Sequence, residues 1–455
     1  MTTQDLAGPG GVAVLDTPLS PIEQWRARPA DQQPDWPDPV ELRDVVAELA
    51  ACPPLVDARE CDRLRDRLAV VARGEAFLLQ GGDCAELFDE VTAEAVHGKV
   101  RMLSQMAAVL AYGASKPVVR VGRIAGQYAK PRSRPFETVD GRTLPVYRGD
   151  AVNGQAFTER AREADPGRLR RMYEASATTL NLIRMATATG GAGGADLRAL
   201  NRAFAASTTG RRHRRLTGEI DRALGFLGAS GVSPATLGAA EQFTSHEGLL
   251  LDYETSLTRL DPLTGRHYAT SGHLVWIGER TRALTGAHVD YFAAIANPIG
   301  VKLGPTARPD DVLALIDKLD PAREPGRLTF ITRMGTDQVH SRLPDIVDRV
   351  SRSGSQVVWV CDPMHGNTFS TASGVKTRHV EDVLAEIAGF FAVHRALGTH
   401  AGGIHLELTG AEVTECVGGG ITVEDLASRY ESACDPRLNR SQSLELAYRV
   451  ADLMR

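Results

Sequence analysis

The chain has 455 residues, of which 43% are hydrophobic and 24% are charged, and its formal net charge at pH 7 is -5. This composition is typical of a globular protein with a buried core, and the charge excludes a general electrostatic attraction to nucleic acid or to a membrane surface. No apolar stretch approaches the length that is needed to span a bilayer. Because the net charge is negative, an anionic ligand would have to be bound by a local cluster of cations rather than by the overall field.

The first 73 residues come before any strand-like pattern. Residues 1–20 contain no Lys or Arg, which predicts a disordered tail without the charged region of a secretory signal. Residues 21–73 contain two amphipathic stretches, Pro39–Ala51 and Asp57–Arg73, between Pro-rich turns. We interpret 21–73 as an N-terminal helical extension that packs on a catalytic domain of residues 74–455.

Eight short apolar runs follow, and each ends in or near an ionisable residue: 76–82, 116–124, 240–247, 273–279, 299–304, 328–334, 356–362 and 402–408. A continuous apolar run is typical of a strand that helices cover on both faces. Most of the intervals have a helical pattern, as in Pro309–Leu319, Pro344–Ser353 and Val380–Leu397. Eight such units predict an α/β fold, the closed (β/α)8 TIM barrel. Of the eight runs, Gln242–Glu247 also fits a loop.

The interval between the second and third runs is too long for one crossover helix. Three segments in it have a helical pattern: Pro166–Met185, Ala195–Phe204 and Arg215–Leu227. A Gly-rich break at 190–194 separates the first two. We interpret residues 155–232, approximately, as extra helices that are inserted on the flank of the barrel for oligomer contacts or regulation.

The six cysteines form no CxxC pair and are widely spaced. In a chain of this length the spacing indicates reduced thiols, of which one or two could bind a metal or take part in catalysis. Together with the absence of a secretory pattern, this favours a cytoplasmic protein.

Basic residues lie at or just after the apolar runs: Arg123, Lys130, Arg132, Arg280, Lys302 and Arg333. The carboxyl ends of parallel strands meet at one face of a barrel, so these like charges would lie close together. Burying them without anions would be costly, whereas phosphate and carboxylate groups would balance them. Any one of them alone could be an ordinary surface cation. As a set they predict ligands with two or more anionic groups.

Four further residues near these strand ends are of metal-binding types: Cys84, His365, Glu407 and Asp435. This mixture of soft and hard donors suits a first-row divalent ion such as Mn, Co, Fe or Zn. Only closure of a barrel would bring the first and eighth strands together. The alternative is that Cys84 is a small core residue and that His365 makes structural hydrogen bonds only.

Six segments carry a more specific signal: LLQGGDCAE (78–86), GRIAGQYAKPRS (122–133), WIGERTR (276–282), VKLGP (301–305), RMG (333–335) and CDPMHGNT (361–368). Together they closely resemble the type II (plant-like) 3-deoxy-D-arabino-heptulosonate 7-phosphate (DAHP) synthases. The resemblance covers roughly residue 21 to the C-terminus. It implies a transferase that opens the shikimate pathway of aromatic amino acid biosynthesis by condensing phosphoenolpyruvate with erythrose 4-phosphate and releasing phosphate.

The resemblance also implies roles for individual residues. One divalent ion (Mn²⁺, Co²⁺ or similar) would be bound by Cys84, His365, Glu407 and Asp435. Phosphoenolpyruvate would be bound by Arg123, Glu279, Arg280, Lys302 and Arg333. Erythrose 4-phosphate would be bound by Lys130, Pro131, Arg132 and Ser133. Lys130 and His365 are the candidate catalytic residues for transfer of the water proton.

Three alternatives keep the barrel but change its function. An aminodeoxyheptulosonate synthase of an antibiotic pathway would use an imino analogue of the aldose. A metal-dependent aldolase or lyase would not need a dedicated site for a carboxylate and a phosphate. A regulatory subunit with an inactive site would not need the metal ligands.

Family resemblance also raises the question of regulation. Relatives with an N-terminal extension and extra flank helices are often inhibited by aromatic amino acids, and a homo-oligomer, either dimer or tetramer, is expected. Cys434 lies beside Asp435, so a Cys84–Cys434 disulfide under oxidation would block metal binding.

Overall fold

The structure is a computed structural model that describes residues 20–188, 194–206, 210–231 and 241–455. The predicted tail, apart from Ser20, and most of the predicted Gly-rich break lie outside the described residues. Within the described part of the chain, no helix is long and apolar enough to cross a membrane.

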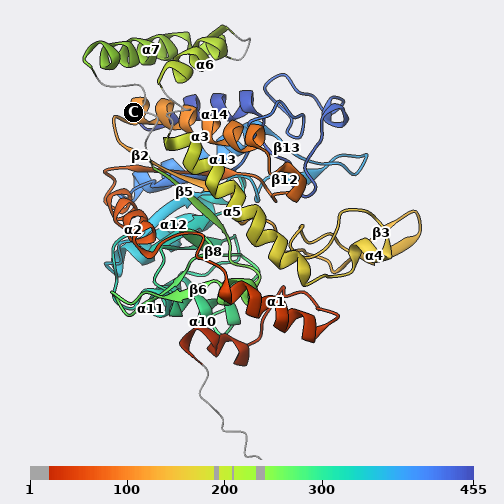
Figure 1. Cartoon of the computed structure of the whole chain (residues 1–455). Helices are drawn as coiled ribbons and strands as arrows, with labels where there is room; N and C mark the ends of the chain where they lie inside the picture. Colours follow the sequence, from red (N-terminus) through yellow and green to blue (C-terminus); the bar gives the residue numbers. More distant parts are fainter. Residues whose placement is uncertain (1–19, 189–193, 207–209, 232–240) are drawn as a thin grey trace, which may run out of the picture.

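Eight parallel strands close into a barrel at the centre of the fold (Figure 1). In spatial order they are β1 (Phe77–Gly82), β14 (Gly403–Glu407), β11 (Val358–Cys361), β10 (Leu328–Thr332), β9 (Ile299–Leu303), β8 (Leu274–Ile277), β5 (Gln242–Glu247) and β2 (Val118–Arg123). Each of the eight predicted runs contains one of these strands. The (β/α)8 barrel is therefore confirmed, and the loop alternative for the third run is wrong.

The register at the closure of the barrel aligns three strand ends. Gly82, at the end of β1, pairs with Arg123 of β2 on one side and with Glu407 of β14 on the other. A Cβ atom at Gly82 would lie 2.4 Å from the Arg123 carbonyl oxygen, so this approach requires glycine. Closure therefore brings together Arg123 and Glu407, which are 284 positions apart in the sequence.

The N-terminal end of the barrel is closed by α2 (Ala58–Ala72), which begins with a capping box between Asp57 and Glu60. The apolar face of α2, including Leu64 and Leu68, packs in one cluster with side chains of the barrel strands such as Leu78. This end of the barrel is therefore filled by packed side chains, and the charged strand ends lie at the opposite end.

The remaining barrel helices surround the strands, in the order α3 (Ala93–Ala114), α10 (Ala287–Ala294), α11 (Pro309–Leu319), α12 (Val339–Arg352), α13 (Val380–Ala396) and α14 (Arg440–Leu453). The predicted start of α12 at Pro344 is wrong, since the helix begins at Val339. Its buried apolar face continues through the proline with Val339, Leu343 and Val347. That packing offsets the hydrogen bond that Pro344 cannot donate.

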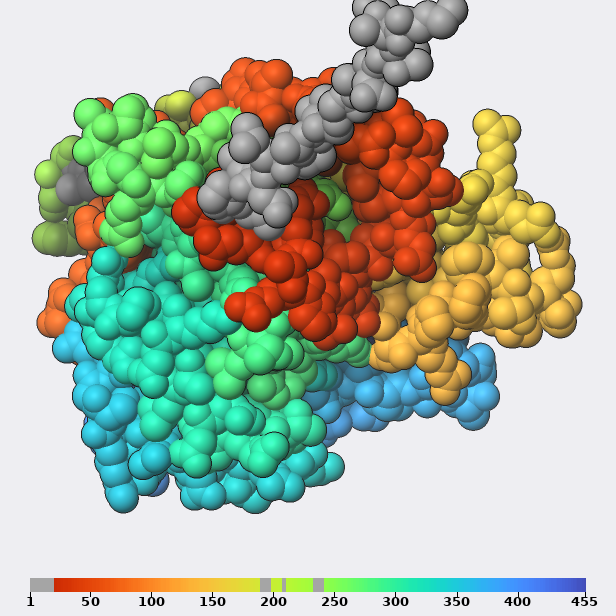
Figure 2. Space-filling model, turned by 90° about the horizontal axis from the view of Figure 1, so that it is seen from below, coloured from red at the N-terminus to blue at the C-terminus, as the bar shows by residue number. Residues whose placement is uncertain are grey.

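The N-terminal extension lies against the barrel rather than apart from it. It consists of η1 (Pro21–Ala27), α1 (Pro39–Ala51) and α2. In Figure 2 these residues, in red, lie over the green surface that the segments around residues 250–300 form. The Trp25 indole donates a hydrogen bond of 2.9 Å to Thr255 in α9 (Leu251–Ser256).

The long interval between β2 and β5 contains α4 (Glu159–Arg162), α5 (Gly167–Ala188), α6 (Gly194–Ala206), η3 (Gly210–His213) and α7 (Arg214–Ala229). The three predicted helical segments correspond to α5, α6 and α7. A hairpin of β3 (Phe136–Val139) and β4 (Arg142–Pro145) was not predicted. Its Asp140-Gly141 turn, with φ values of 48° and 77°, has the sequence signal of a tight hairpin.

Short elements complete the chain: η2 (Phe88–Glu90), β6 (Thr258–Leu260), β7 (His267–Ala269), β12 (Thr368–Ser370), β13 (Lys376–Arg378) and η4 (Leu426–Ser428). The β12–β13 hairpin follows the seventh barrel strand, and it carries side chains to the same end of the barrel as the charged strand ends.

Candidate active site

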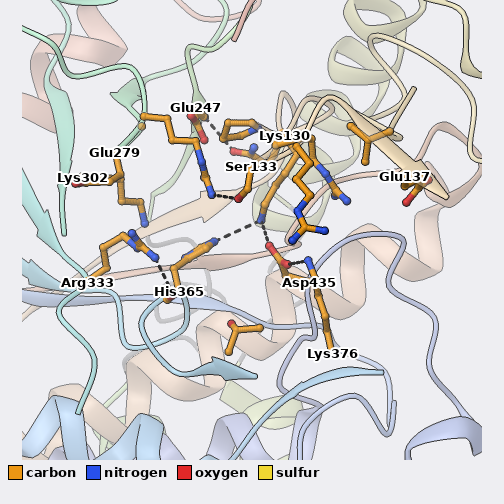
Figure 3. Close-up of a pocket in the computed structure, with 18 of the residues that line it drawn as sticks. Lys130, Ser133, Glu137, Glu247, Glu279, Lys302, Arg333, His365, Lys376 and Asp435 are labelled. Carbon is orange, nitrogen blue, oxygen red and sulfur yellow. Dashed lines mark hydrogen bonds and ion pairs between the residues drawn. The ribbon is translucent and has the colours of Figure 1, made fainter. Parts of the chain in front are cut away.

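A cavity of about 590 Å³ opens at the carboxyl ends of the barrel strands (Figure 3). Every site residue predicted from the sequence lines this cavity except Cys84 and Glu407, which are fully buried. Eleven predicted residues share the wall: Arg123, Lys130, Pro131, Arg132, Ser133, Glu279, Arg280, Lys302, Arg333, His365 and Asp435. The structure thus brings the predicted cations and the predicted metal ligands to one place.

Three of the four predicted metal ligands form a compact group. Cys84, Glu407 and Asp435 each offer a donor atom, and these atoms lie within 4.8 Å of one another. His365 adjoins the group, with its Nε2 3.0 Å from Glu407 Oε1. One thiol, two carboxylates and an imidazole fit a first-row divalent ion.

The charge states of these donors differ. Burial raises the pKa of the Cys84 thiol well above its usual range, so binding a metal would require this thiol to lose its proton. Burial also works against ionisation of Glu407, but His365, Lys130 and other cations outweigh it and hold the pKa of Glu407 well below its usual value.

Lys130 is the cation that joins the group. Its Nζ lies 2.8 Å from Cys84 Sγ, 2.8 Å from Glu407 Oε1 and 3.0 Å from Asp435 Oδ2. It is also 3.4 Å from His365 Nε2. Burial opposes the charged form, but the negative neighbours raise the pKa of the Lys130 ammonium well above its usual range. At neutral pH Lys130 can therefore stabilise negative charge or donate a hydrogen bond, but it cannot act as a base.

Arg123 is held rigidly at the end of β2. Its Nε donates to the Asp83 carbonyl oxygen at 3.0 Å, and its Nη2 donates to the Cys84 carbonyl oxygen and to Glu407 Oε1, both at 3.1 Å. Its Nη1 donates to His405 Nε2, inside the barrel. A guanidinium fixed by this many acceptors presents a defined face to the cavity, which suits recognition of a planar anion.

Lys302, on β9, forms a buried ion pair with Asp362, which follows β11. Burial lowers the pKa of Lys302 to about 8, and the attraction of Asp362 only partly offsets this. The same Asp362 oxygen accepts a hydrogen bond of 2.7 Å from His365 Nδ1. Asp362 therefore contacts a predicted phosphoenolpyruvate residue and a predicted metal ligand at once.

The segment of residues 130–133 crosses the cavity mouth. The Lys130 N–H donates to the Arg148 carbonyl oxygen at 2.8 Å, and the Arg132 N–H donates to Gln32 Oε1 at 2.9 Å. Arg280 Nη2 donates to Ser133 Oγ at 2.6 Å, which links this segment to the end of β8. The N-terminal extension, through Gln32, thus helps to position the segment that was predicted to bind the aldose phosphate.

The predicted residues Glu279 and Arg333 differ in whether their side-chain atoms already have hydrogen-bond partners. The Glu279 carboxylate already accepts from Arg282 Nη2 at 2.9 Å and from the Gly304 N–H at 2.6 Å, so it ties β8 to the end of β9. Arg333 Nη2 donates to the His365 carbonyl oxygen at 2.7 Å, whereas its Nε is buried with no hydrogen-bond partner among the described residues. Arg333 is therefore the better placed of the two to contact an anion.

Sequence reasoning missed Glu247, which ends β5 and lines the cavity. Its Oε1 is buried without a hydrogen-bond partner in the described part of the chain. Burial raises the pKa of Glu247, and Lys130, Lys302 and Arg123 only partly counteract this. A carboxyl group of raised pKa facing a ligand cavity can exchange a proton with a bound molecule. The only signal in the sequence was its position at the end of the third strand.

Two basic residues on β13 were also missed. Arg378 Nη2 donates to Glu407 Oε2 at 2.7 Å, and Lys376 Nζ lies 3.1 Å from Asp435 Oδ1. Both therefore support a predicted metal ligand from outside the barrel. They escaped notice because they follow no apolar barrel strand, and the β12–β13 hairpin that brings them back is short.

Cys84 and Cys434 lie in one small apolar cluster and interact through their side chains. Both are free thiols in the structure. Because Cys84 also belongs to the metal-type group, a bond between the two sulfurs would remove one donor from it.

Comparisons with known proteins agree with this geometry. The model of the class-II DAHP synthetase family matches residues 20–451. A phospho-2-dehydro-3-deoxyheptonate aldolase of Streptomyces coelicolor is 59% identical over 434 residues, which cover 95% of this chain and 96% of the relative. The AroG phospho-2-dehydro-3-deoxyheptonate aldolase of Mycolicibacterium smegmatis is 52% identical over 437 residues, covering 94% and 93%. The chain therefore belongs to the class-II DAHP synthetase family.

Proposed function

We propose that this chain is a metal-dependent 3-deoxy-7-phosphoheptulonate synthase. It joins phosphoenolpyruvate to erythrose 4-phosphate with uptake of water and release of phosphate, the first step of the shikimate pathway. The observation that carries the proposal is one cavity whose wall holds cations from several strand ends and which adjoins a Cys/Glu/Asp donor group. Both relatives bear the name of this activity.

Phosphoenolpyruvate, a carboxylate with a phosphate ester, would be bound by Arg123, Glu279, Arg280, Lys302 and Arg333. Arg123 and Lys302 are buried and lie at the ends of β2 and β9, while the Arg333 Nε has no competing partner among the described residues. Arg280 is exposed at the cavity mouth. Glu279 acts by holding Arg282 and the Gly304 backbone in place. Fixed cations of this kind orient the substrate and balance its charge.

Erythrose 4-phosphate would lie along residues 130–133, with its phosphate near Arg132 and Ser133 and its aldehyde toward Lys130. Arg132 and Ser133 line the mouth of the cavity, whereas Lys130 is buried beside Glu407. The four-residue segment spans the distance between the exposed mouth and the buried donor group, and an aldose phosphate needs contacts at both of its ends.

A divalent ion such as Mn²⁺ or Co²⁺ would be held by Cys84, His365, Glu407 and Asp435, and when bound it would supply a Lewis acid for the aldehyde oxygen. In the reaction, C3 of phosphoenolpyruvate bonds to the aldehyde carbon, water adds at C2, and the phosphate leaves as the C2–O bond to it breaks. The Lys130 ammonium stabilises charge on the former aldehyde oxygen. Glu247 takes the proton that the added water loses. Asp362 accepts a hydrogen bond from His365 Nδ1 and so directs the other ring nitrogen, Nε2, toward the donor group.

The test is identification of the product. Purified protein with phosphoenolpyruvate, erythrose 4-phosphate and Mn²⁺ is expected to form a seven-carbon phosphorylated acid and an equal amount of inorganic phosphate, measured by mass spectrometry and a phosphate assay. Formation of an adduct without phosphate release would support the aldolase alternative instead. Turnover with an imino aldose analogue but not with erythrose 4-phosphate would support the antibiotic-pathway alternative.

We propose that the inserted helices serve assembly or regulation. Phe226 on α7 is 69% exposed, and burying its ring against a second copy of the chain would be favourable. Light scattering should therefore show a dimer or tetramer. Activity measured with Trp, Phe and Tyr, alone and combined, tests inhibition by aromatic amino acids.

A further inference from the structure

Asp362 is a buried carboxylate with a full set of donors. It follows β11 directly, and its side chain is 0% exposed. Oδ1 accepts from the backbone N–H groups of Met364, at 3.0 Å, and His365, at 3.3 Å. These two bonds fix the turn that carries His365 toward the donor group.

The second oxygen of Asp362 is shared between two functional side chains. Oδ2 accepts from Lys302 Nζ and, at 2.7 Å, from His365 Nδ1. Asp362 holds a proton on Nδ1, which leaves Nε2 as the nitrogen that can bind a metal, and Nε2 faces Glu407 Oε1 at 3.0 Å. Asp362 thus sets both the tautomer and the direction of the metal-facing nitrogen. A carboxylate that accepts a hydrogen bond from a metal-binding histidine also makes that histidine a stronger metal ligand.

We infer that Asp362 is a positioning residue that couples metal binding to phosphoenolpyruvate binding through this shared oxygen. The inference rests on the proposed function, since Lys302 must contact an anionic substrate group. An anion on Lys302 offsets the ammonium charge that otherwise competes for Oδ2. Asp362 then polarises the His365 N–H more strongly, and the imidazole becomes a better metal ligand. Coupling between two binding sites is reciprocal, so the metal tightens phosphoenolpyruvate binding by the same factor.

The chain offers a matched control in a second buried carboxylate–histidine pair. Glu254 Oε1 lies 2.8 Å from His246 Nε2, and Glu254 Oε2 accepts from Ser271 Oγ at 2.5 Å. Glu254 is 1% exposed and His246 is 0% exposed, yet neither lines the cavity. Replacing Glu254 with Gln removes a buried charge from a histidine, as Asp362→Asn does, but leaves the proposed site untouched.

The experiment measures Mn²⁺ affinity by calorimetry on the full-length protein, with and without phosphoenolpyruvate. In the wild type, phosphoenolpyruvate should tighten Mn²⁺ binding several-fold. In Asp362→Asn, Mn²⁺ binding should weaken about 10- to 100-fold and the effect of phosphoenolpyruvate should largely disappear. Glu254→Gln should keep both values within about twofold of the wild type. The visible spectrum of bound Co²⁺ should change on addition of phosphoenolpyruvate in the wild type but not in Asp362→Asn.

A second variant keeps the inference testable if Asp362→Asn does not fold. Lys302→Met leaves Oδ2 to His365 alone, so without phosphoenolpyruvate it should bind Mn²⁺ more tightly than the wild type. Weaker Mn²⁺ binding by Lys302→Met would overturn the inference, as would unchanged affinity and coupling in Asp362→Asn. A wild type that binds phosphoenolpyruvate in calorimetry without any change in its Mn²⁺ affinity would also overturn the inference, whereas a wild type that does not bind phosphoenolpyruvate at all would overturn the proposed function instead. The Mn²⁺ titrations without substrate still test the role of Asp362 toward His365.

Discussion

Replacing Glu247 with Gln removes one ionisable group from the cavity and changes little else. The amide has the shape of the carboxyl group, and the Glu247 N–H keeps its 3.0 Å bond to Gln127 Oε1 because that bond is made by the backbone. Glu247 Oε1 has no hydrogen-bond partner in the described part of the chain, so no partner is lost. The melting temperature and the KM for phosphoenolpyruvate should therefore stay close to those of the wild type.

The expected loss is in turnover. A positioned general base contributes about 10²- to 10⁴-fold, so kcat should fall by that factor, or about 3–5 kcal/mol in the activation barrier. Burial raises the pKa of Glu247, so the wild-type enzyme should lose activity as the pH falls. This fall in activity, the acid limb of the pH profile, should begin at a higher pH than the ordinary pKa of a carboxyl group would give. The variant should lack this acid limb. Phosphate release measured from pH 5 to 9 checks both points.

Glu241→Gln is the matched control, because Glu241 precedes the same strand but is exposed and pairs with Arg63 at the surface. Its kcat and pH profile should equal those of the wild type. A Glu247→Gln variant with kcat within threefold of the wild type, or with an unchanged acid limb, would refute the assignment of proton transfer to Glu247.

Three further predictions concern other parts of the site. Because Lys302 has a pKa of about 8, it loses its positive charge as the pH rises through that value. The KM for phosphoenolpyruvate should therefore rise above about pH 8. The variant Lys302→Arg stays charged and should not show this rise. Cys84→Ser should weaken Mn²⁺ binding in calorimetry about tenfold or more, whereas a Cys52→Ser control should not. Gly82→Ala would place a Cβ atom 2.4 Å from the Arg123 carbonyl oxygen and should destabilise the fold by about 2–4 kcal/mol in denaturant unfolding. A methyl group on Gly98 meets no atom within 4 Å, so an equal loss in Gly98→Ala would contradict this reason.

The barrel could be predicted from the sequence because most of its strands are buried on both faces and therefore read as apolar runs. The exception is β5, whose sequence QFTSHE is mostly polar and also fitted a loop. Helix bounds were accurate where a capping residue or an N-terminal proline marks the start, as in α1 and α11. They failed in α12, where Pro344 lies inside the helix rather than at its start. A proline marks a helix start only when the residues before it do not continue the apolar face.

The site residues could be predicted from the sequence where they lie at the ends of barrel strands. Arg123, Lys302 and Glu407 end or nearly end their strands, so topology alone brings them together. Arg378 depends on a short hairpin that returns to the barrel, and the pattern of apolar runs contains no sign of it. Glu247 was passed over because a single acidic residue after a short polar strand does not differ from a surface residue until its burial is known.

The central claim is that one cavity holds a metal and two phosphorylated substrates for a single reaction. The most direct measurement is phosphate release by protein treated with a chelator, before and after addition of Mn²⁺, with phosphoenolpyruvate and erythrose 4-phosphate supplied separately and together. Phosphate should appear only when the metal and both substrates are present. Release from phosphoenolpyruvate alone, or at an equal rate after chelation, would contradict the account.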